Sequence, residues 1–298
     1  MTHEKQESFA LGVSFTLLSS LGMSLIGLFG KIGDQIFSLT GLIFWRFFAA
    51  FIISVIFFWI LGDFKRPLRI GNVKMHIMRA CLVLIAQYSY YFYIEKGTLL
   101  NGTMLLCTGP LFIPLIEWVF LRKKVGHSTW ISLVVSFIGV ICILQPDREI
   151  FSMLSAMGLL SGICQGGSQV VFGLNAREER SDLGVLYLMF FSALFSLGPY
   201  VIQEAHHISE SGGLWMSILL VIALGASSVF NQMSRAVAYR HGTPSKLAVF
   251  LYFSVVIAGF WDWLVFKDIP NILSMIGAFL VILGGILKIY IHSWRVKS

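Results

Sequence analysis

Ten long apolar stretches run through this chain of 298 residues, and each has the length of a membrane-spanning helix. Such a helix needs about 20 predominantly apolar residues. The stretches lie at 9–30, 37–61, 75–95, 99–121, 127–145, 153–174, 184–203, 214–238, 244–266 and 271–291. Charged residues make up only 12% of the chain, against about 25% in a typical soluble domain. The sequence therefore predicts an all-α integral membrane protein with ten transmembrane helices and no soluble domain.

One helix pattern occurs twice along the chain. Three landmarks recur at a shift of 145 residues: Gly97-Thr98 with Gly242-Thr243, Glu117-Trp118 with Asp262-Trp263, and Gly139 with Gly284. We therefore expect two five-helix repeats, at 9–146 and 153–292. Because five is an odd number, the second copy enters the membrane with the opposite sense, and the repeats are inverted. Inverted repeats enclose a seam at the bilayer midplane, where many transporters bind their solute.

The basic residues predict how the bundle is oriented. Cytoplasmic loops of membrane proteins carry an excess of Lys and Arg. With a cytoplasmic N-terminus, 15 basic residues lie inside and four outside, while Arg46, Arg79 and Arg235 lie within or at the edge of spans. We therefore expect a multi-pass protein of the cytoplasmic (inner) membrane with both termini in the cytoplasm. The net charge of +7 comes from loops that attract anionic membrane lipid, and it requires no nucleic acid partner.

Several short motifs recur in a fixed order in both copies. The first copy contains Arg46-Phe47, Arg79-Ala80, Gly97-Thr98, Pro110-Leu111-Phe112 and Gly139-Val140. The second contains Ala238-Tyr239-Arg240-His241-Gly242-Thr243-Pro244, Phe266-Lys267-Asp268, Ile276-Gly277-Ala278 and Gly284-Gly285. In this order and duplication the chain resembles the EamA-like family of the drug/metabolite transporter superfamily, over roughly residues 9–292.

The resemblance implies ten helices in two inverted repeats and transport of small organic metabolites. It also implies that the first four helices of each repeat surround a cavity. The fifth and tenth helices would pack at the periphery, where the contacts of a homodimer are expected.

Polar side chains inside the spans are the candidate site, because each costs free energy unless it has a partner. Arg46 lies well within the second span, where an arginine costs about 2.5–3.5 kcal/mol on insertion scales. It either binds an anionic group of the solute or acts as a structural clamp on backbone carbonyls. Near the inner end of the eighth span, Asn231, Gln232 and Arg235 form a polar helix face.

Two glutamines, Gln87 and Gln232, occupy equivalent positions in the third helix of each copy. This equivalence predicts that both lie near the axis between the halves, either as solute contacts or as interhelical hydrogen bonds. Tyr91 shares a helix face with Gln87 and is the tyrosine expected in the cavity. Gln165 and Gln169 lie one turn apart on the sixth span and are expected to line the same cavity.

The landmark acids Glu117 and Asp262 are candidates for proton coupling. A carboxylate in low-dielectric surroundings can exchange a proton within the working pH range. The alternative is that both carboxylates reach the membrane interface, with Glu117 near Arg122 and Asp262 near Lys267.

Sequence patterns of catalysis and metal binding do not occur. The motifs HExxH, GxSxG, GxxxxGK[ST] and paired CxxC are absent, and the four cysteines lie in apolar spans at irregular spacing. We therefore expect no enzyme activity, no metal and no cofactor. The expected function is a secondary transporter, an exporter of an amino acid or related metabolite that works by alternating access. The alternatives are a broad-specificity multidrug efflux carrier and an importer of nucleoside-like metabolites.

Overall fold

The computed structural model describes residues 2–60, 72–96, 99–146, 150, 153–178, 181–204, 213–267 and 269–297. Every regular element in these residues is helical, which confirms the prediction of an all-α protein for this part of the chain. The elements are α1 (Thr2–Gly33), α2 (Leu39–Ile60), α3 (Val73–Lys96), α4 (Leu99–Leu106), α5 (Gly109–Leu121), α6 (His127–Leu144), α7 (Ser155–Glu178), α8 (Ser181–Glu204), α9 (Leu214–His241), α10 (Pro244–Leu247), the 3-10 helix η3 (Ala248–Tyr252), α11 (Phe253–Phe266) and α12 (Ile272–Lys297).

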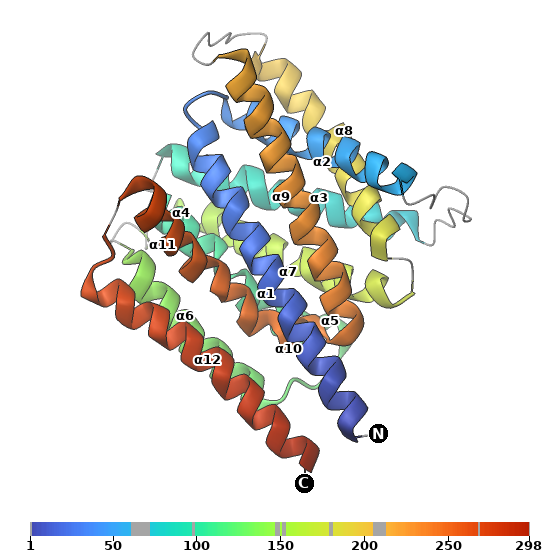
Figure 1. The fold of residues 1–298 in the computed structure, drawn as a ribbon, viewed down its shortest axis with the longest axis vertical. Coiled ribbons are helices and arrows are strands. Elements are labelled where there is room, and N and C mark those ends of the chain that lie inside the picture. Colours follow the sequence, from blue (N-terminus) through green and yellow to red (C-terminus); the bar gives the residue numbers. More distant parts are fainter. Residues whose placement is uncertain are drawn as a thin grey trace.

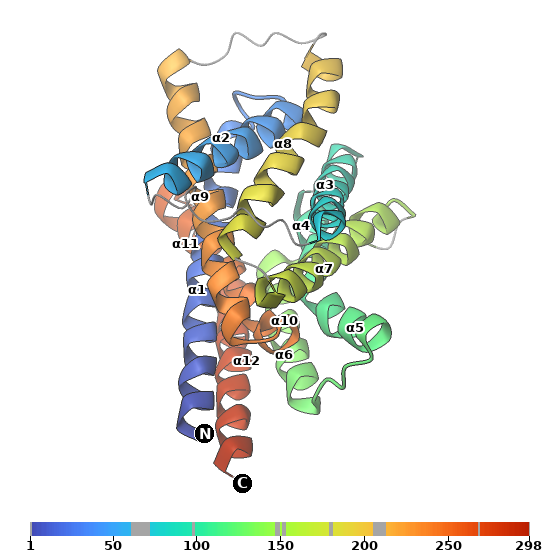
Figure 2. The ribbon, with the colours of Figure 1, turned by 90° about the vertical axis from the view of Figure 1, so that its right-hand side faces the viewer.

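Nine segments of the described chain are long and apolar enough to cross a membrane, judged by length and composition. They match nine of the ten predicted stretches, with α4 and α5 in one segment and α10, η3 and α11 in another. The helix that does not qualify is α7, which has 24 residues but contains Gln165, Gln169 and Asn175. Figures 1 and 2 show the beginning of α1 and the end of α12 at the same end of the bundle.

Large apolar side chains cover much of the outer surface. Trp59, Phe120 and Trp215 are 75%, 78% and 78% exposed. A surface this apolar requires lipid and not water around it. Inside the bundle, small and apolar residues such as Ala50 and Leu133 are fully buried.

The fourth and ninth predicted spans are both interrupted, and the interruptions are equivalent. Cys107 and Thr108 form a turn between α4 and α5, while Tyr252 ends η3 just before α11. Cys107 and Tyr252 are related by the same 145-residue shift as the landmarks, and they pack in one apolar cluster. The two breaks therefore lie beside each other in the middle of the bundle.

The helices that follow these breaks also end alike. Arg122 after α5 and Lys267 after α11 adopt left-handed φ values of 52° and 61°. Their backbone N–H groups donate to the carbonyl oxygens of Glu117 and Asp262, respectively. The repeat seen in the sequence is thus repeated in local backbone structure.

Each major contact between a helix of the first copy and a helix of the second has a counterpart in which the two copies change places. α1 packs on α9, and their equivalents α7 and α3 pack on each other. In the same way, the contact of α2 with α9 corresponds to that of α8 with α3, and the contact of α1 with α11 to that of α7 with α5. Two further interfaces join equivalent helices directly, α2 with α8 and α6 with α12.

Both of these direct interfaces are antiparallel. Gly139 of α6 lies against Gly277 of α12, whereas Ser136, which comes earlier in α6, lies against Gly284, which comes later in α12. Likewise, the aromatic pairs Phe44 with Tyr200 and Phe51 with Phe190 join α2 to α8 in opposite senses. Equivalent helices of the two copies therefore run in opposite directions where they meet.

Close helix packing depends on glycine where α7 meets α4 and α5. On α7, Gly158, Gly162 and Gly166 face the junction of α4 and α5. A Cβ atom at Gly162 would lie 2.6 Å from the carbonyl oxygen of Leu105, closer than real atoms approach. This stripe of small residues therefore allows α7 to contact the interrupted helix backbone to backbone.

Candidate functional site

The polar side chains inside the bundle form two clusters at opposite ends of α3. The Arg46 cluster consists of Arg46, Tyr88 and Tyr91, and the Arg79 cluster consists of Arg79, Gln169, Gln232, Arg235 and Tyr239. Twelve residues separate Arg79 from Tyr91, which is about 18 Å at a rise of about 1.5 Å per residue. The two clusters therefore lie well apart along α3.

Arg46 of α2 has no polar partner in the described residues. It is half-buried, and it forms no hydrogen bond or ion pair within that part of the chain. Its guanidinium carbon lies 4.5 Å from the ring centre of Phe47. Arg46 shares a helix face with Ile43 and Ala50, which are 1% and 0% exposed, so its side chain starts from the inward face of α2. The structural-clamp interpretation finds no support in these contacts.

Tyr88 and Tyr91 of α3 complete the Arg46 cluster. Tyr91 is within electrostatic range of Arg46, and Tyr88 is within range of Tyr91. The hydroxyl of Tyr88 is buried and has no hydrogen-bond partner among the described residues. Gln87, next to Tyr88, is buried and also lacks a hydrogen bond to that part of the chain. The cluster thus offers hydrogen-bond donors for which the described protein supplies no acceptor.

Arg79 is a site residue that the sequence analysis missed. The sequence placed it at the edge of a span, yet its side chain is only 1% exposed. Its Nη2 donates to Oε1 of Gln232 at 2.8 Å, and its Nη1 to the carbonyl of Gly184 at 3.4 Å. The guanidinium carbon also lies 3.4 Å from the ring centre of Phe172. Arg79 therefore connects α3 to α7, α8 and α9. The sequence signal that could have identified it as a site residue is a charged residue at the start of a long apolar run.

Arg235 and Gln169 belong to the same cluster. Arg235 is buried within electrostatic range of Arg79 and Tyr239, and its Nε donates to Oγ of Ser19 at 3.0 Å. The hydroxyl of Tyr239 donates to Oε1 of Gln169 at 3.1 Å, which joins α9 to α7. In the described residues no carboxylate forms an ion pair with Arg79 or Arg235. Hydrogen bonds to neutral groups offset only part of the cost of burying two like charges.

Asn231 and Gln165 make packing contacts. Nδ2 of Asn231 donates to the carbonyl of Ser19 at 2.6 Å and is 3.2 Å from its Oγ, which joins α9 to α1. Gln165 of α7 lies against Gly109 at the start of α5. Gln165 therefore lies beside the interruption between α4 and α5, whereas Asn231 connects the continuous helices α9 and α1.

The two repeat-related acids lie in different surroundings. Glu117 is 2% exposed, and no described residue forms an ion pair or side-chain hydrogen bond with it. The Asp262 side chain is 43% exposed and accepts a hydrogen bond from Nζ of Lys31 at 2.8 Å. Asp262 thus pairs with Lys31 and not with Lys267, because packing brings α1 against α11. Among the described residues, Arg122 forms no ion pair with Glu117.

Within the described ranges, no group of three or more His, Cys, Asp and Glu side chains is arranged to hold a metal ion.

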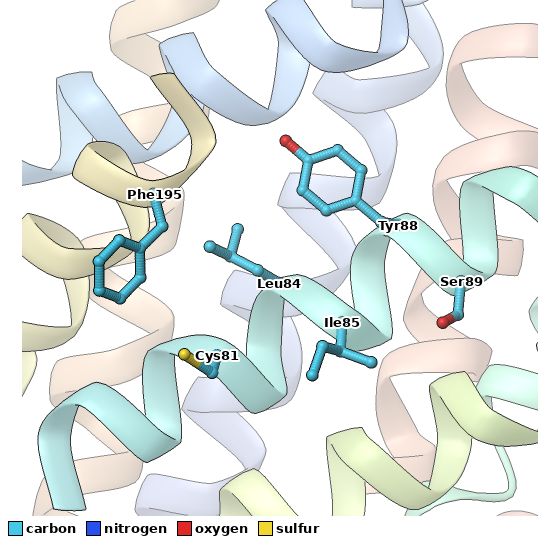
Figure 3. A pocket seen from close by; sticks show the side chains of 6 residues that line it. All are labelled: Cys81, Leu84, Ile85, Tyr88, Ser89 and Phe195. Atoms are coloured by element: carbon cyan, nitrogen blue, oxygen red, sulfur yellow. The ribbon is translucent and has the colours of Figure 1, made fainter. Parts of the chain in front are cut away.

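An open, mostly apolar cleft of about 460 Å³ lies between α3 and α8. It is lined by Cys81, Leu84, Ile85, Tyr88, Ser89 and Phe195. Figure 3 shows the ring of Tyr88 pointing away from Ile85 and Ser89. Tyr88, a member of the Arg46 cluster, thus also lines this cleft.

Known proteins resemble this chain over most of its length. The pseudopaline exporter CntI of Pseudomonas aeruginosa (strain UCBPP-PA14) is 22% identical, covering 92% of this chain and 94% of its own. The S-adenosylmethionine uptake transporter of Rickettsia felis is 21% identical, covering 95% and 94%. The riboflavin transporter of Vibrio cholerae is 25% identical, covering 78% and 76%.

The fold and the family follow from two further matches. A crystal structure of a protein with 13% sequence identity superimposes with a TM-score of 0.78, over 96% of this chain and 99% of that one, so the fold is shared. The family model of the EamA-like transporter family matches residues 10–145 and again residues 153–290. The family and its named relatives are transporters and not enzymes. With its apolar helices, the chain is a multi-pass membrane protein that belongs to the EamA-like transporter family.

Proposed function

We propose that this protein is a secondary carrier that moves a small organic metabolite across the cytoplasmic membrane by alternating access. Ten helices form two inverted repeats, at 9–146 and 153–292, which rock against each other around a solute bound at the seam. The direction is export, and the cargo is an amino acid or a related compound.

The interrupted helices carry this proposal. Interruptions at corresponding positions of two repeats are the best structural pointer to a transporter's solute site. Here they fall at Cys107-Thr108 and at Tyr252, which pack in one apolar cluster. The unpartnered donors of Arg46 and Tyr88 lie on helices of the same bundle. A seam with broken helices, and with donors that have no acceptor among the described residues, suits a carrier.

The proposed inversion is supported by helix directions and chain ends. The equivalent pairs α2 with α8 and α6 with α12 each meet antiparallel, as two halves of opposite sense require. The beginning of α1 and the end of α12 lie at one end of the bundle, which requires an even number of crossings. We therefore assign α7 as the tenth span, because its polar side chains face other helices and not lipid.

The names of the relatives support a metabolite as cargo. They describe an exporter of pseudopaline and transporters of S-adenosylmethionine and riboflavin. The excess of basic residues in the predicted inner loops supports cytoplasmic termini. A homodimer would form through the outer faces of α6 and α12, which expose Ile138 and Phe279.

Transport in proteoliposomes tests the proposal. The full chain is reconstituted, and uptake of radiolabelled amino acids, nucleosides, S-adenosylmethionine, riboflavin and a lipophilic dye is measured with and without a pH gradient. We expect saturable transport of at least one metabolite. Gln87→Ala and Gln232→Ala should reduce it about tenfold or more at equal abundance, whereas Gln203→Ala, at an exposed end of α8, should not.

The alternatives give different results in the same assay. Dye transport that survives both glutamine substitutions would identify a multidrug carrier. Inward transport of nucleosides only would identify an importer. No transport of any compound by protein that elutes as a folded species would refute the carrier function.

A further inference from the structure

We infer that the Arg46 cluster binds an anionic group, a carboxylate in the first instance, and that the carried solute is therefore an organic anion or a zwitterion. The binding site stands on its own contacts. Only its assignment to the carried solute rests on the proposed function.

The position of Arg46 requires a polar partner. The residue is on the face of α2 that carries the fully buried Ile43 and Ala50, so it points into the bundle. The residue as a whole is half-buried. Its Nε is buried without an acceptor among the described residues. An intramembrane arginine whose donors find no acceptor among the described residues needs water or a ligand as its partner.

The chemistry of the neighbours selects an anion. A guanidinium group has five N–H donors and no acceptor, and its planar fork matches a carboxylate. Tyr88 adds a buried hydroxyl without a partner in the described chain. Asp34 is within electrostatic range of Tyr91, but it forms no ion pair with Arg46. A ligand that supplies negatively charged acceptors completes this site, and a cation does not.

The Arg79 cluster has the same sign of charge. Arg79 of α3 and Arg235 of α9 add two more guanidinium groups, and the described residues give them only neutral hydrogen-bond partners. Arg79 lies about 18 Å from Tyr91 along α3, at about 1.5 Å per residue. Both arginines are held by these partners, although Nε of Arg79 is buried without a partner among the described residues. They keep positive charge in the seam, which attracts anions toward Arg46.

A cysteine reporter measures this preference without knowledge of the solute. Cys81, Cys107, Cys142 and Cys164 are replaced by alanine in the full-length chain, and Tyr91→Cys is added. The purified protein in phosphatidylcholine nanodiscs is treated with sulfonatoethyl or trimethylammonium-ethyl methanethiosulfonate, which are anionic and cationic. We expect the anionic reagent to react about tenfold faster than the cationic one, after correction for their rates with a free thiol.

Two substitutions assign the preference to Arg46. Arg46→Gln should abolish most of the tenfold ratio, and Arg46→Lys should retain it because the charge remains. Asn271→Cys, at an exposed position in the link between α11 and α12, is the matched control, and its ratio should not change with Arg46→Gln. A faster cationic reagent, a ratio insensitive to Arg46→Gln, or no labelling of Tyr91→Cys by either reagent would overturn the inference. Gel filtration establishes that each variant is folded.

Two further measurements distinguish a bound lipid headgroup from a bound solute, and the anion site from the carrier function. If adding phosphatidylglycerol to the nanodiscs slows labelling, a lipid headgroup occupies the cluster, and the solute assignment is wrong. If the charge preference is present but no metabolite is transported, the carrier proposal fails while the anion site stands. If only cationic metabolites are transported and the charge preference is absent, the anion inference fails while the carrier function stands.

Discussion

At the scale of single residues, the two acids related by the repeat are not equivalent. Glu117 is buried and has no ionic partner in the described residues, whereas Asp262 is half-exposed and paired with Lys31. The charge of Asp262 is already balanced and partly hydrated. Of the two acids proposed for proton coupling, Glu117 is therefore the one that lies inside the bundle.

This difference gives a prediction for proton coupling. Glu117→Gln should abolish the response of transport to a pH gradient while exchange of unlabelled for labelled solute continues. Asp262→Asn should leave that response within about twofold, because an exposed ion pair contributes only about 0–1 kcal/mol. The measurement is uptake in proteoliposomes with an imposed gradient. An unchanged gradient response in Glu117→Gln would remove Glu117 from the coupling mechanism.

At the scale of helices, small residues determine how closely equivalent elements approach. α6 and α12 meet where Gly139 lies against the backbone of Gly277, and Oγ of Ser136 donates to the carbonyl of Val281 at 3.3 Å. Ser136 and Val281 are themselves related by the 145-residue shift. Equivalent positions of α6 and α12 therefore contact each other, and the axis that relates the two helices lies between them.

This interface predicts a large effect of a single methyl group. A Cβ at position 139 would lie 2.6 Å from the carbonyl oxygen of Gly277. Gly139→Ala should therefore force the helices apart and destabilise the protein by about 1–3 kcal/mol. Gly259→Ala is the control, because a Cβ there meets no atom within 4 Å. Thermal unfolding in detergent should show a lower midpoint for Gly139→Ala only, and equal midpoints would contradict the packing.

At the scale of the whole molecule, the position of the chain ends constrains the number of crossings. The beginning of α1 and the end of α12 lie together at one end of the bundle. With cytoplasmic termini, the short link between α1 and α2 lies outside.

Topology reporters test this arrangement in cells. Alkaline phosphatase fused after Gln35, in the link between α1 and α2, should be active, and the enzyme fused after Ser298 should be inactive. Green fluorescent protein at the same two positions should give the opposite pattern. An active phosphatase at the C-terminus would mean an odd number of spans, with α7 not crossing the membrane.

Much of the architecture could be predicted from the sequence, because hydropathy and repetition are signals along the chain. A run of about 20 apolar residues forms a spanning helix whatever its neighbours are, since lipid cannot satisfy backbone polar groups. The shift of 145 residues likewise predicts that α2 is equivalent to α8 and α6 to α12, and these equivalent helices contact each other. The break within the fourth span was not predicted, although Thr108-Gly109-Pro110 at that point is a turn signal in the sequence.

Only the tertiary structure decided which polar groups meet. Arg79 and Gln232 are 153 residues apart, and Lys31 and Asp262 are 231 residues apart. Their contacts depend on which helix faces pack together, and that choice is made by small residues and core shape across the whole bundle. For the same reason the sequence could name Arg46 as a candidate but could not show that it lacks a partner.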